Sequence, residues 1–317
     1  MYSRRSFLSI ALASGALAGK DQKPMAGIFP IVQTPFTSDN KLDTRTLAAE
    51  IRFLDKTGAH GVVWPQLASE YADLTMNERL AGMEAVAGAG KGLKPAVVLG
   101  VQANDAATAL KYTKHAEKLA PDALIALPPR EEKDKAKILA YYKTIGENCS
   151  RPLFAQTIGD MSVDFVIQMA TEVPNLRYIK DEAGQTLPRV SEYRRKNSPH
   201  IHGVFTGGHG KTLLDEMARG SAGTMPAVPF ADLYVAVWDS WKAERHGEAM
   251  DRFAKVMLLV TQITAYGLPS IKYLLELRGV FPNHVCRSAA KNSAFDDEAK
   301  QTLKQTMEYV RPLLRTT

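Results

Sequence analysis

The sequence is poor in the residues and patterns that mark metal proteins, nucleic-acid binders and multidomain chains. It contains only two cysteines, Cys149 and Cys286, with no Cys-x-x-Cys pair and no histidine spaced to complete a zinc site, so we expect no metal. The two cysteines could form one disulfide, but free thiols are the expected state. No basic stretch is interleaved with aromatic residues, which argues against nucleic acid as a partner. No linker rich in serine and glycine marks a hinged second domain.

The overall composition is that of a soluble globular protein. Hydrophobic residues make up 45% of the 317 residues and charged residues 23%, which provides enough apolar material for a large core. The 40 basic and 34 acidic residues leave a formal net charge of +6. A mild positive balance of this kind suits a small anionic substrate.

The N-terminal segment has the layout of a bacterial twin-arginine export signal. Arg4 and Arg5 are followed by a short apolar run rich in alanine and then by the small-x-small pattern Ala16-Leu-Ala18. The apolar run is too short to span a bilayer. We therefore expect residues 1–24 to be a signal and leader, cleaved near Gly19, and the mature protein to be periplasmic or exported. The alternative is an amphipathic N-terminal helix with two incidental arginines.

Short apolar runs alternate with longer segments of helical spacing over most of the chain. Because strands that alternate with helices pair in parallel, eight such units predict a (β/α)₈ TIM barrel over residues 25–245, with a doubly wound open sheet as the rival fold. After it we expect a C-terminal helical extension over residues 246–317. The eight predicted strands are residues 27–32, 61–64, 95–101, 122–127, 152–157, 177–181, 201–206 and 221–225.

Lys180 is the most informative single residue, because it stands at the end of a short apolar run, residues 177–181. In a barrel of this kind the chemistry takes place at the carboxyl ends of the strands. A buried position there disfavours the ammonium form of a lysine and makes its neutral amine available as a nucleophile. The alternative is an ordinary lysine paired with Asp181 or Glu182.

The other strand ends bring polar residues and glycines to the same rim. The glycine-rich turn at residues 206–212 resembles part of a phosphate-binding loop, but Phe205 occupies the position of a required glycine, so a nucleotide site is excluded. Its free amides could bind another anion, its His209 could contact the substrate, and a simple tight turn is the alternative. The residues expected to bind substrate are Thr34, Ser69, Glu70, Gly207, Gly208 and Thr224.

Four motifs lie at or near the predicted strand ends. They are Thr34-Pro-Phe36 in the first unit, Ser69-Glu70 followed by Leu74-Thr75, the strand Tyr178-Ile-Lys-Asp181, and Gly220-x-x-Gly223. With these motifs, residues 27–287 resemble the dihydrodipicolinate synthase and N-acetylneuraminate lyase family of class I aldolases. The resemblance implies a Schiff base between Lys180 and a pyruvate-like 2-oxo acid, no separate cofactor, and a homo-oligomer, either a dimer or a tetramer.

Two departures from the family pattern narrow the reaction. The loop Gln66-Leu-Ala-Ser-Glu70 stands where the family has Gly-Thr-Thr-Gly-Glu, which leaves Ser69 and backbone amides for the substrate carboxylate. Gln156 stands where the family has a tyrosine that moves protons, and an amide has no usable pKa near neutral pH.

Both departures resemble the 2-keto-3-deoxy-L-arabonate dehydratase branch, as do the first strand Phe29-Pro-Ile-Val32 and Glu182 two residues after the lysine. The resemblance implies that an iminium at C2 acidifies the C3 proton and that the enamine then expels the C4 hydroxyl as water. Ser69, Glu70 and Glu182 are the candidates for moving the protons, and each could equally be structural. A pyruvate-dependent aldolase and an exported binding protein that has lost turnover are the alternatives.

Overall fold

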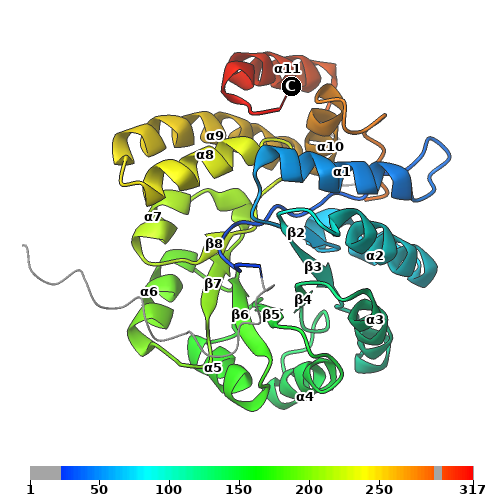
Figure 1. The fold of residues 1–317 in the computed structure, drawn as a ribbon, viewed down its shortest axis with the longest axis vertical. Coiled ribbons are helices and arrows are strands. Elements are labelled where there is room, and N and C mark those ends of the chain that lie inside the picture. Colours follow the sequence, from blue (N-terminus) through cyan, green and yellow to red (C-terminus); the bar gives the residue numbers. More distant parts are fainter. Residues whose placement is uncertain (1–22, 289–294, 317) are drawn as a thin grey trace, which may run out of the picture.

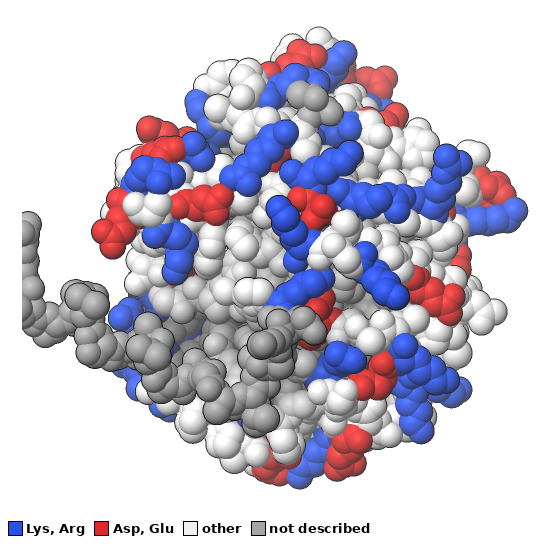
Figure 2. All heavy atoms as spheres, in the orientation of Figure 1, with Lys and Arg blue, Asp and Glu red and all other residues white. Residues whose placement is uncertain are grey.

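The computed structural model describes residues 23–288 and 295–316. The predicted export signal, except for its last two residues, lies outside the described residues. No helix within the described ranges is long and apolar enough to cross a membrane. Cys149 and Cys286 are half-buried and are not joined to each other. Figure 2 shows basic and acidic side chains interspersed over the face in view.

Eight parallel strands form the barrel, as predicted, so the open-sheet alternative is wrong. The sheet has the order β1-β8-β7-β6-β5-β4-β3-β2. It closes between β1 and β2, where the Val32 N–H donates to the Val63 carbonyl at 3.0 Å. The strands are β1 (Gly27–Ile28), β2 (Gly61–Trp64), β3 (Ala96–Gly100), β4 (Ala123–Ala126), β5 (Leu153–Gln156), β6 (Leu176–Asp181), β7 (Gly203–Thr206) and β8 (Gly223–Thr224).

The first strand is shorter than residues 27–32, the range predicted for it. Its regular pairing covers Gly27–Ile28, and a single bridge at Ile31 resumes the contact with both neighbours. Pro30 lies between the two, and proline has no N–H to donate to a sheet. The ladder is therefore interrupted where the sequence still looks like a continuous apolar strand.

Helices surround the barrel (Figure 1), and five of them begin at a side chain that caps the first turn. Asp43, Thr75, Asp105, Asp134 and Ser162 each accept a backbone N–H of the first turn, a contact worth about 1 kcal/mol apiece. The barrel helices are α1 (Thr44–Thr57), α2 (Met76–Gly90), α3 (Ala106–Leu119), α4 (Lys135–Gly146), α5 (Val163–Glu172), α6 (Thr186–Lys196), α7 (Leu213–Ala218) and α8 (Ala231–Lys242).

The predicted C-terminal extension consists of three further helices beside α8 and α1 (Figure 1). The Arg278 guanidinium joins the extension to the barrel, because it pairs with the Asp232 carboxylate of α8 at 2.9 Å and both side chains are buried. The extension helices are α9 (His246–Tyr266), α10 (Leu268–Leu277) and α11 (Asp297–Val310).

Aromatic side chains fill the barrel interior beneath the rim. Phe154 stacks on Tyr178 with ring centroids 4.8 Å apart, and Phe205 meets Phe29 edge to face at 5.0 Å. Since side chains alternate along a strand, Lys180 lies on the same inward face as Tyr178, one layer nearer the carboxyl end of β6. The lysine therefore stands on a filled apolar interior.

Candidate active site

Lys180 lies at the carboxyl end of β6, as predicted, with 4% of its surface exposed. Its Nζ is 3.1 Å from Oε2 of Glu182. Both side chains line a cavity of about 170 Å³ at the rim of the barrel. The other lining residues are Ile31, Gln33, Leu67, Ala68, Gly208, His209, Met225, Pro226, Ala227 and Ile271.

Glu182 is the group most closely connected to Lys180. Besides the lysine, its carboxylate accepts hydrogen bonds from Nε2 of Gln156 and from the Gly208 N–H at 3.2 Å. Burial raises the pKa of the Glu182 carboxyl, but the charge of Lys180 and the hydrogen bonds from Lys180, Gly208 and Gln156 outweigh it and leave that pKa below its usual value. Glu182 is therefore a carboxylate at neutral pH.

Gly207 allows the carboxylate to take this position. A Cβ at residue 207 would lie 1.6 Å from Oε1 of Glu182, so a side chain there would displace it. The predicted glycine-rich turn therefore positions the Glu182 carboxylate, because Gly207 leaves room for it and the Gly208 N–H donates to it.

Asp181, the other partner considered for Lys180, is turned away from the cavity. Its carboxylate accepts two hydrogen bonds from the Arg189 guanidinium, each at 2.8 Å, and one from the Thr157 hydroxyl at 2.9 Å. The ion pair expected of an ordinary structural lysine is therefore present. Its partner is Glu182, and the pair lies in the wall of the cavity. A lysine and a carboxylate in one cavity wall also form a nucleophile with a proton acceptor beside it.

Thr34 and Ser69 do not line this cavity, and their hydroxyls have protein partners. The Thr34 hydroxyl donates to the Ser69 carbonyl and accepts the Trp64 indole N–H at 3.0 Å. The Ser69 hydroxyl donates to the Val32 carbonyl and accepts the Gln66 N–H at 3.0 Å. These contacts tie the loop after β2 to β1, and substrate binding by either hydroxyl stays a prediction. The same holds for Thr224, whose hydroxyl donates to the Thr206 carbonyl at 3.4 Å.

The contacts of Glu70 are those of a structural residue, which was the alternative to a role in proton transfer. Its buried carboxylate pairs with the ammonium of Lys272 and accepts the N–H groups of Arg287 and Ser288 at 2.7 and 2.8 Å. The amides that it caps belong to the segment after α10 and not to its own loop. Lys272 could not be predicted from the sequence, because a single lysine inside an apolar helix has no spacing that points to a partner.

Gln33 is a polar residue of the cavity around Lys180 that was not predicted. Its N–H donates to Oε1 of Glu50 at 2.9 Å. Burial raises the pKa of the Glu50 carboxyl well above its usual value, although the Gln33 N–H and the charge of Lys272 act against the shift. Within the described residues, Oε1 of Gln33 and Oε1 of Gln156 are buried without a hydrogen-bond partner. Gln33 lines the cavity, so its amide oxygen can accept a hydrogen bond from a ligand.

A larger cavity of about 480 Å³ adjoins the one around Lys180. Leu67, Ala68, His209 and Ile271 line both. Burial, with the charge of Lys211 beside it, lowers the pKa of His209, so the ring at this passage is neutral at pH 7. The rest of the outer cavity comes from Glu70, Ile263, Thr264, Ala265, Tyr266, Gly267, Leu268 and Ser288.

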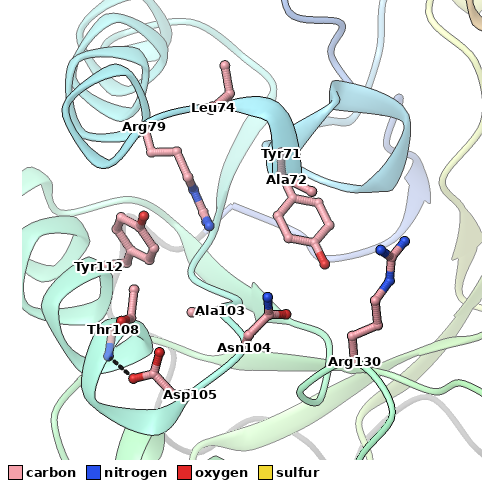
Figure 3. A pocket seen from close by; sticks show the side chains of 10 residues that line it. All are labelled: Tyr71, Ala72, Leu74, Arg79, Ala103, Asn104, Asp105, Thr108, Tyr112 and Arg130. Carbon is pink, nitrogen blue, oxygen red and sulfur yellow. Dashed lines mark hydrogen bonds between the residues drawn. The ribbon is translucent and has the colours of Figure 1, made fainter. Parts of the chain in front are cut away.

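A third pocket, of about 220 Å³, lies apart from Lys180 between the start of α2 and α3, and Figure 3 shows its lining. The buried Arg79 side chain points into it, donates to the Gln102 and Gly100 carbonyls at 2.6 and 2.9 Å, and lies 4.0 Å from the centre of the Tyr112 ring. These bonds fix α2 to the end of β3. No group of three or more His, Cys, Asp or Glu side chains in the described part of the chain could hold a metal ion.

Comparison with known proteins gives a single family. The family model described as the dihydrodipicolinate synthetase family matches residues 24–309. The chain is 30% identical over 193 residues to a 4-hydroxy-tetrahydrodipicolinate synthase of Methanosarcina mazei, an alignment that covers 59% of this chain and 65% of that protein, slightly less than two thirds of its length. It is 24% identical over 263 residues to an L-2-keto-3-deoxyarabonate dehydratase of Azospirillum brasilense, with 80% of this chain and 85% of that protein covered.

Solved structures of similar proteins share the fold. A prophage protein of the dihydrodipicolinic acid synthase family from E. coli K12, crystallised in complex with pyruvate, has a TM-score of 0.82 at 20% identity, with 90% of this chain and 99% of that chain covered. The N-acetylneuraminate lyase of Proteus mirabilis has a TM-score of 0.79 at 18% identity, with 90% and 98% covered. At these identities the likeness shows the fold alone.

Proposed function

The chain belongs to the dihydrodipicolinate synthetase family, a family of lyases, and from that membership and the geometry of its rim we propose that it is a Schiff-base lyase that removes water from a 2-keto-3-deoxy acid. Such acids carry a ketone at C2 and a hydroxyl at C4, and 2-keto-3-deoxy sugar acids are the substrates with which the proposal is tested. The single observation that supports the proposal most strongly is the pair formed by Lys180 and Glu182 in one cavity wall, with Nζ and Oε2 3.1 Å apart.

The proposed reaction begins when the Lys180 ammonium gives a proton to Glu182 and the resulting neutral amine attacks the C2 ketone of the substrate. Glu182 returns that proton to the C2 hydroxyl, which leaves as water and gives an iminium. Glu182 then takes a proton from C3, and the electron pair of that bond forms an enamine. The enamine expels the C4 hydroxyl, which leaves as water after receiving a proton that Glu182 can return. Hydrolysis of the remaining imine frees Lys180 and releases a 2-oxo product. The chemistry needs no separate cofactor, because the covalent imine supplies the electron sink.

Glu182 is the best candidate for the proton transfers because of its position. It lies within hydrogen-bond distance of Lys180 and is ionised near neutral pH, as a general base must be. Ser69 and Glu70, the other two candidates, have their hydroxyl and carboxylate bonded to groups of the protein. We therefore assign the base to Glu182.

Gln156 removes one acid-base group that aldol cleavage in the family uses, although Glu182 remains beside Lys180. Aldol cleavage requires a group that moves a proton on and off the C4 hydroxyl, and a positioned acid or base contributes roughly 10² to 10⁴ in rate to such a step. The Gln156 amide cannot do this. It can donate to Glu182 through Nε2.

Trapping with borohydride tests the covalent mechanism. Pyruvate or a 2-keto-3-deoxy acid with borohydride should add a stable mass to Lys180, and peptide mapping locates it. Lys180→Arg should remove the label because a guanidinium stays protonated and cannot attack, whereas Lys143→Arg, at an exposed lysine paired with Glu172, should keep it.

The products distinguish the possible activities. Loss of water from a 2-keto-3-deoxy sugar acid, followed by NMR, supports the dehydratase. Pyruvate release without a dehydration product would support the aldolase, a reaction of the type named for the lyase and synthase relatives. Failure of every 2-oxo acid to label Lys180 would leave the non-catalytic binding protein.

A further inference from the structure

We propose that the part of the substrate beyond C4 is an apolar chain or ring that enters the outer cavity, and not a polyhydroxylated tail. The proposal rests on the proposed function, because it places C2 of the substrate at Lys180. It names the substrate class that the described wall of the site selects.

The polar groups of the inner cavity gather at one end. Lys180, Glu182 and the Gly208 N–H lie together there, and Gln33 adds an amide. The remaining wall is formed mainly by apolar residues, namely Ile31, Leu67, Ala68, Met225, Pro226, Ala227 and Ile271. The C2 ketone of a 2-oxo acid therefore lies at the end that holds Lys180, and the carbons that follow meet an apolar wall.

The passage between the two cavities continues this wall. Leu67 and Ala68 from the loop after β2 and Ile271 from α10 line both sides of it. Among the residues that the structure describes, His209 is the only polar side chain shared by the two cavities. An inner cavity of about 170 Å³ has room for the reacting carbons of a small acid, and the outer one has about 480 Å³ beyond it. A substrate longer than the inner cavity must extend along Leu67 and Ile271.

The outer cavity continues the apolar wall with Ile263, Ala265 and Leu268. Two of its polar side chains already have partners in the protein. The Glu70 carboxylate is paired with Lys272, and the Ser288 hydroxyl donates to Asp73.

Thr264 and Tyr266 bring the remaining hydroxyls, which can serve a polar group at the far end of a ligand. Hydroxyls on a substrate tail that lose water along the apolar residues without gaining a partner weaken binding, whereas apolar surface on the tail gains from leaving water. The described wall therefore favours an apolar tail.

Leu67 gives the argument a second basis. Its side chain is 50% exposed, and a ligand that extends outward from Lys180 would cover it. Covering such a side chain removes apolar area from water and strengthens binding in proportion to that area.

The test compares three 2-oxo acids as partners for Lys180. Pyruvate, 2-oxooctanoate and 2-keto-3-deoxygluconate are each titrated with borohydride, and the labelled fraction of Lys180 is measured by mass spectrometry. We expect half-labelling by 2-oxooctanoate at a concentration about tenfold or more below that of pyruvate, equivalent to about 1.4 kcal/mol. We expect 2-keto-3-deoxygluconate to gain no such advantage over pyruvate.

Two variants place the effect in the cavities. Leu67→Asn and Ala265→Asp should each raise the concentration of 2-oxooctanoate needed for half-labelling by about threefold or more, because they put polar groups on the wall. Met250→Thr is the matched control, since Met250 is 56% exposed on α9 and lines neither cavity. Circular dichroism and thermal unfolding verify that the variants are folded.

The outcomes separate this inference from the proposed function. If pyruvate labels Lys180 but 2-oxooctanoate has no advantage, or if 2-keto-3-deoxygluconate labels at the lowest concentration, the apolar tail is refuted and the Schiff-base lyase stands. If none of the three acids labels Lys180, the proposed function fails and the inference fails with it.

Discussion

Replacing Glu182 with glutamine should separate imine formation from the elimination that follows it. The carboxylate offers two acceptor oxygens, with the Gly208 N–H on Oε1 at 3.2 Å and with Lys180, at 3.1 Å, and Gln156 on Oε2. A glutamine at this position keeps only one of these acceptors, and its NH₂ group must face a donor. It also lacks the basicity needed to take the C3 proton.

The expected loss follows from that role. Removal of a general base costs roughly 10² to 10⁴ in rate, or about 2.7 to 5.4 kcal/mol of activation free energy at 1.36 kcal/mol per decade. The effect on folding should be smaller, about 1 kcal/mol, because glutamine keeps the shape of the side chain and one acceptor oxygen and loses only the hydrogen bonds of the other oxygen. A large fall in kcat with a nearly unchanged free energy of unfolding is therefore the expected signature.

The assay has two parts. Dehydration of a 2-keto-3-deoxy acid is followed by NMR for kcat, and pyruvate trapping by borohydride reports the imine. Glu182→Gln should lose the dehydration activity and should still form the imine that borohydride traps. A kcat within about tenfold of wild type would refute the assignment of the base.

The pH profile gives an independent measurement of the same group. Burial raises the pKa of Glu182, but Lys180 and the hydrogen bonds lower it by more, so the pKa in the folded protein lies below that in the unfolded chain. The carboxylate therefore stays ionised above pH 4.5, and any loss of kcat or stability from its protonation must occur as the pH falls below that value. An acid limb near pH 6 or 7 would belong to another group.

Two further predictions concern residues around the site. Lys272→Met should lower the free energy of unfolding by about 3 to 5 kcal/mol in urea denaturation, because it leaves the Glu70 carboxylate buried without its cation. Lys304→Met, at an exposed lysine, is the control, and a loss of stability no greater than that of the control would contradict the prediction. Gly207→Ala should reduce kcat by about tenfold or more with little change in melting temperature, because its Cβ displaces the Glu182 carboxylate, and an unchanged kcat would show that the position of Glu182 does not matter.

The sequence was sufficient for the barrel and for the location of its rim. All eight strands were found because parallel strands buried on both faces form continuous apolar runs, and Lys180 was found because it ends one of them. The direction of a hydroxyl or carboxylate at the rim could not be predicted in the same way. Ser69 and Glu70 lie at the predicted strand end, but their partners come from β1 and from the segment after α10. Partners so far apart in the chain are set by how the barrel closes.

The pair of Glu70 and Lys272 also bears on how the chain becomes complete during its synthesis. The two residues are 202 positions apart, so the carboxylate is made long before its cation. A fragment ending at residue 245 would contain every barrel strand but would lack Lys272 and the amides of residues 287 and 288. Its loop after β2 would hold a carboxylate that must remain hydrated or protonated. A barrel cut at residue 245 would therefore lack every group that pairs with the Glu70 carboxylate in the described part of the chain.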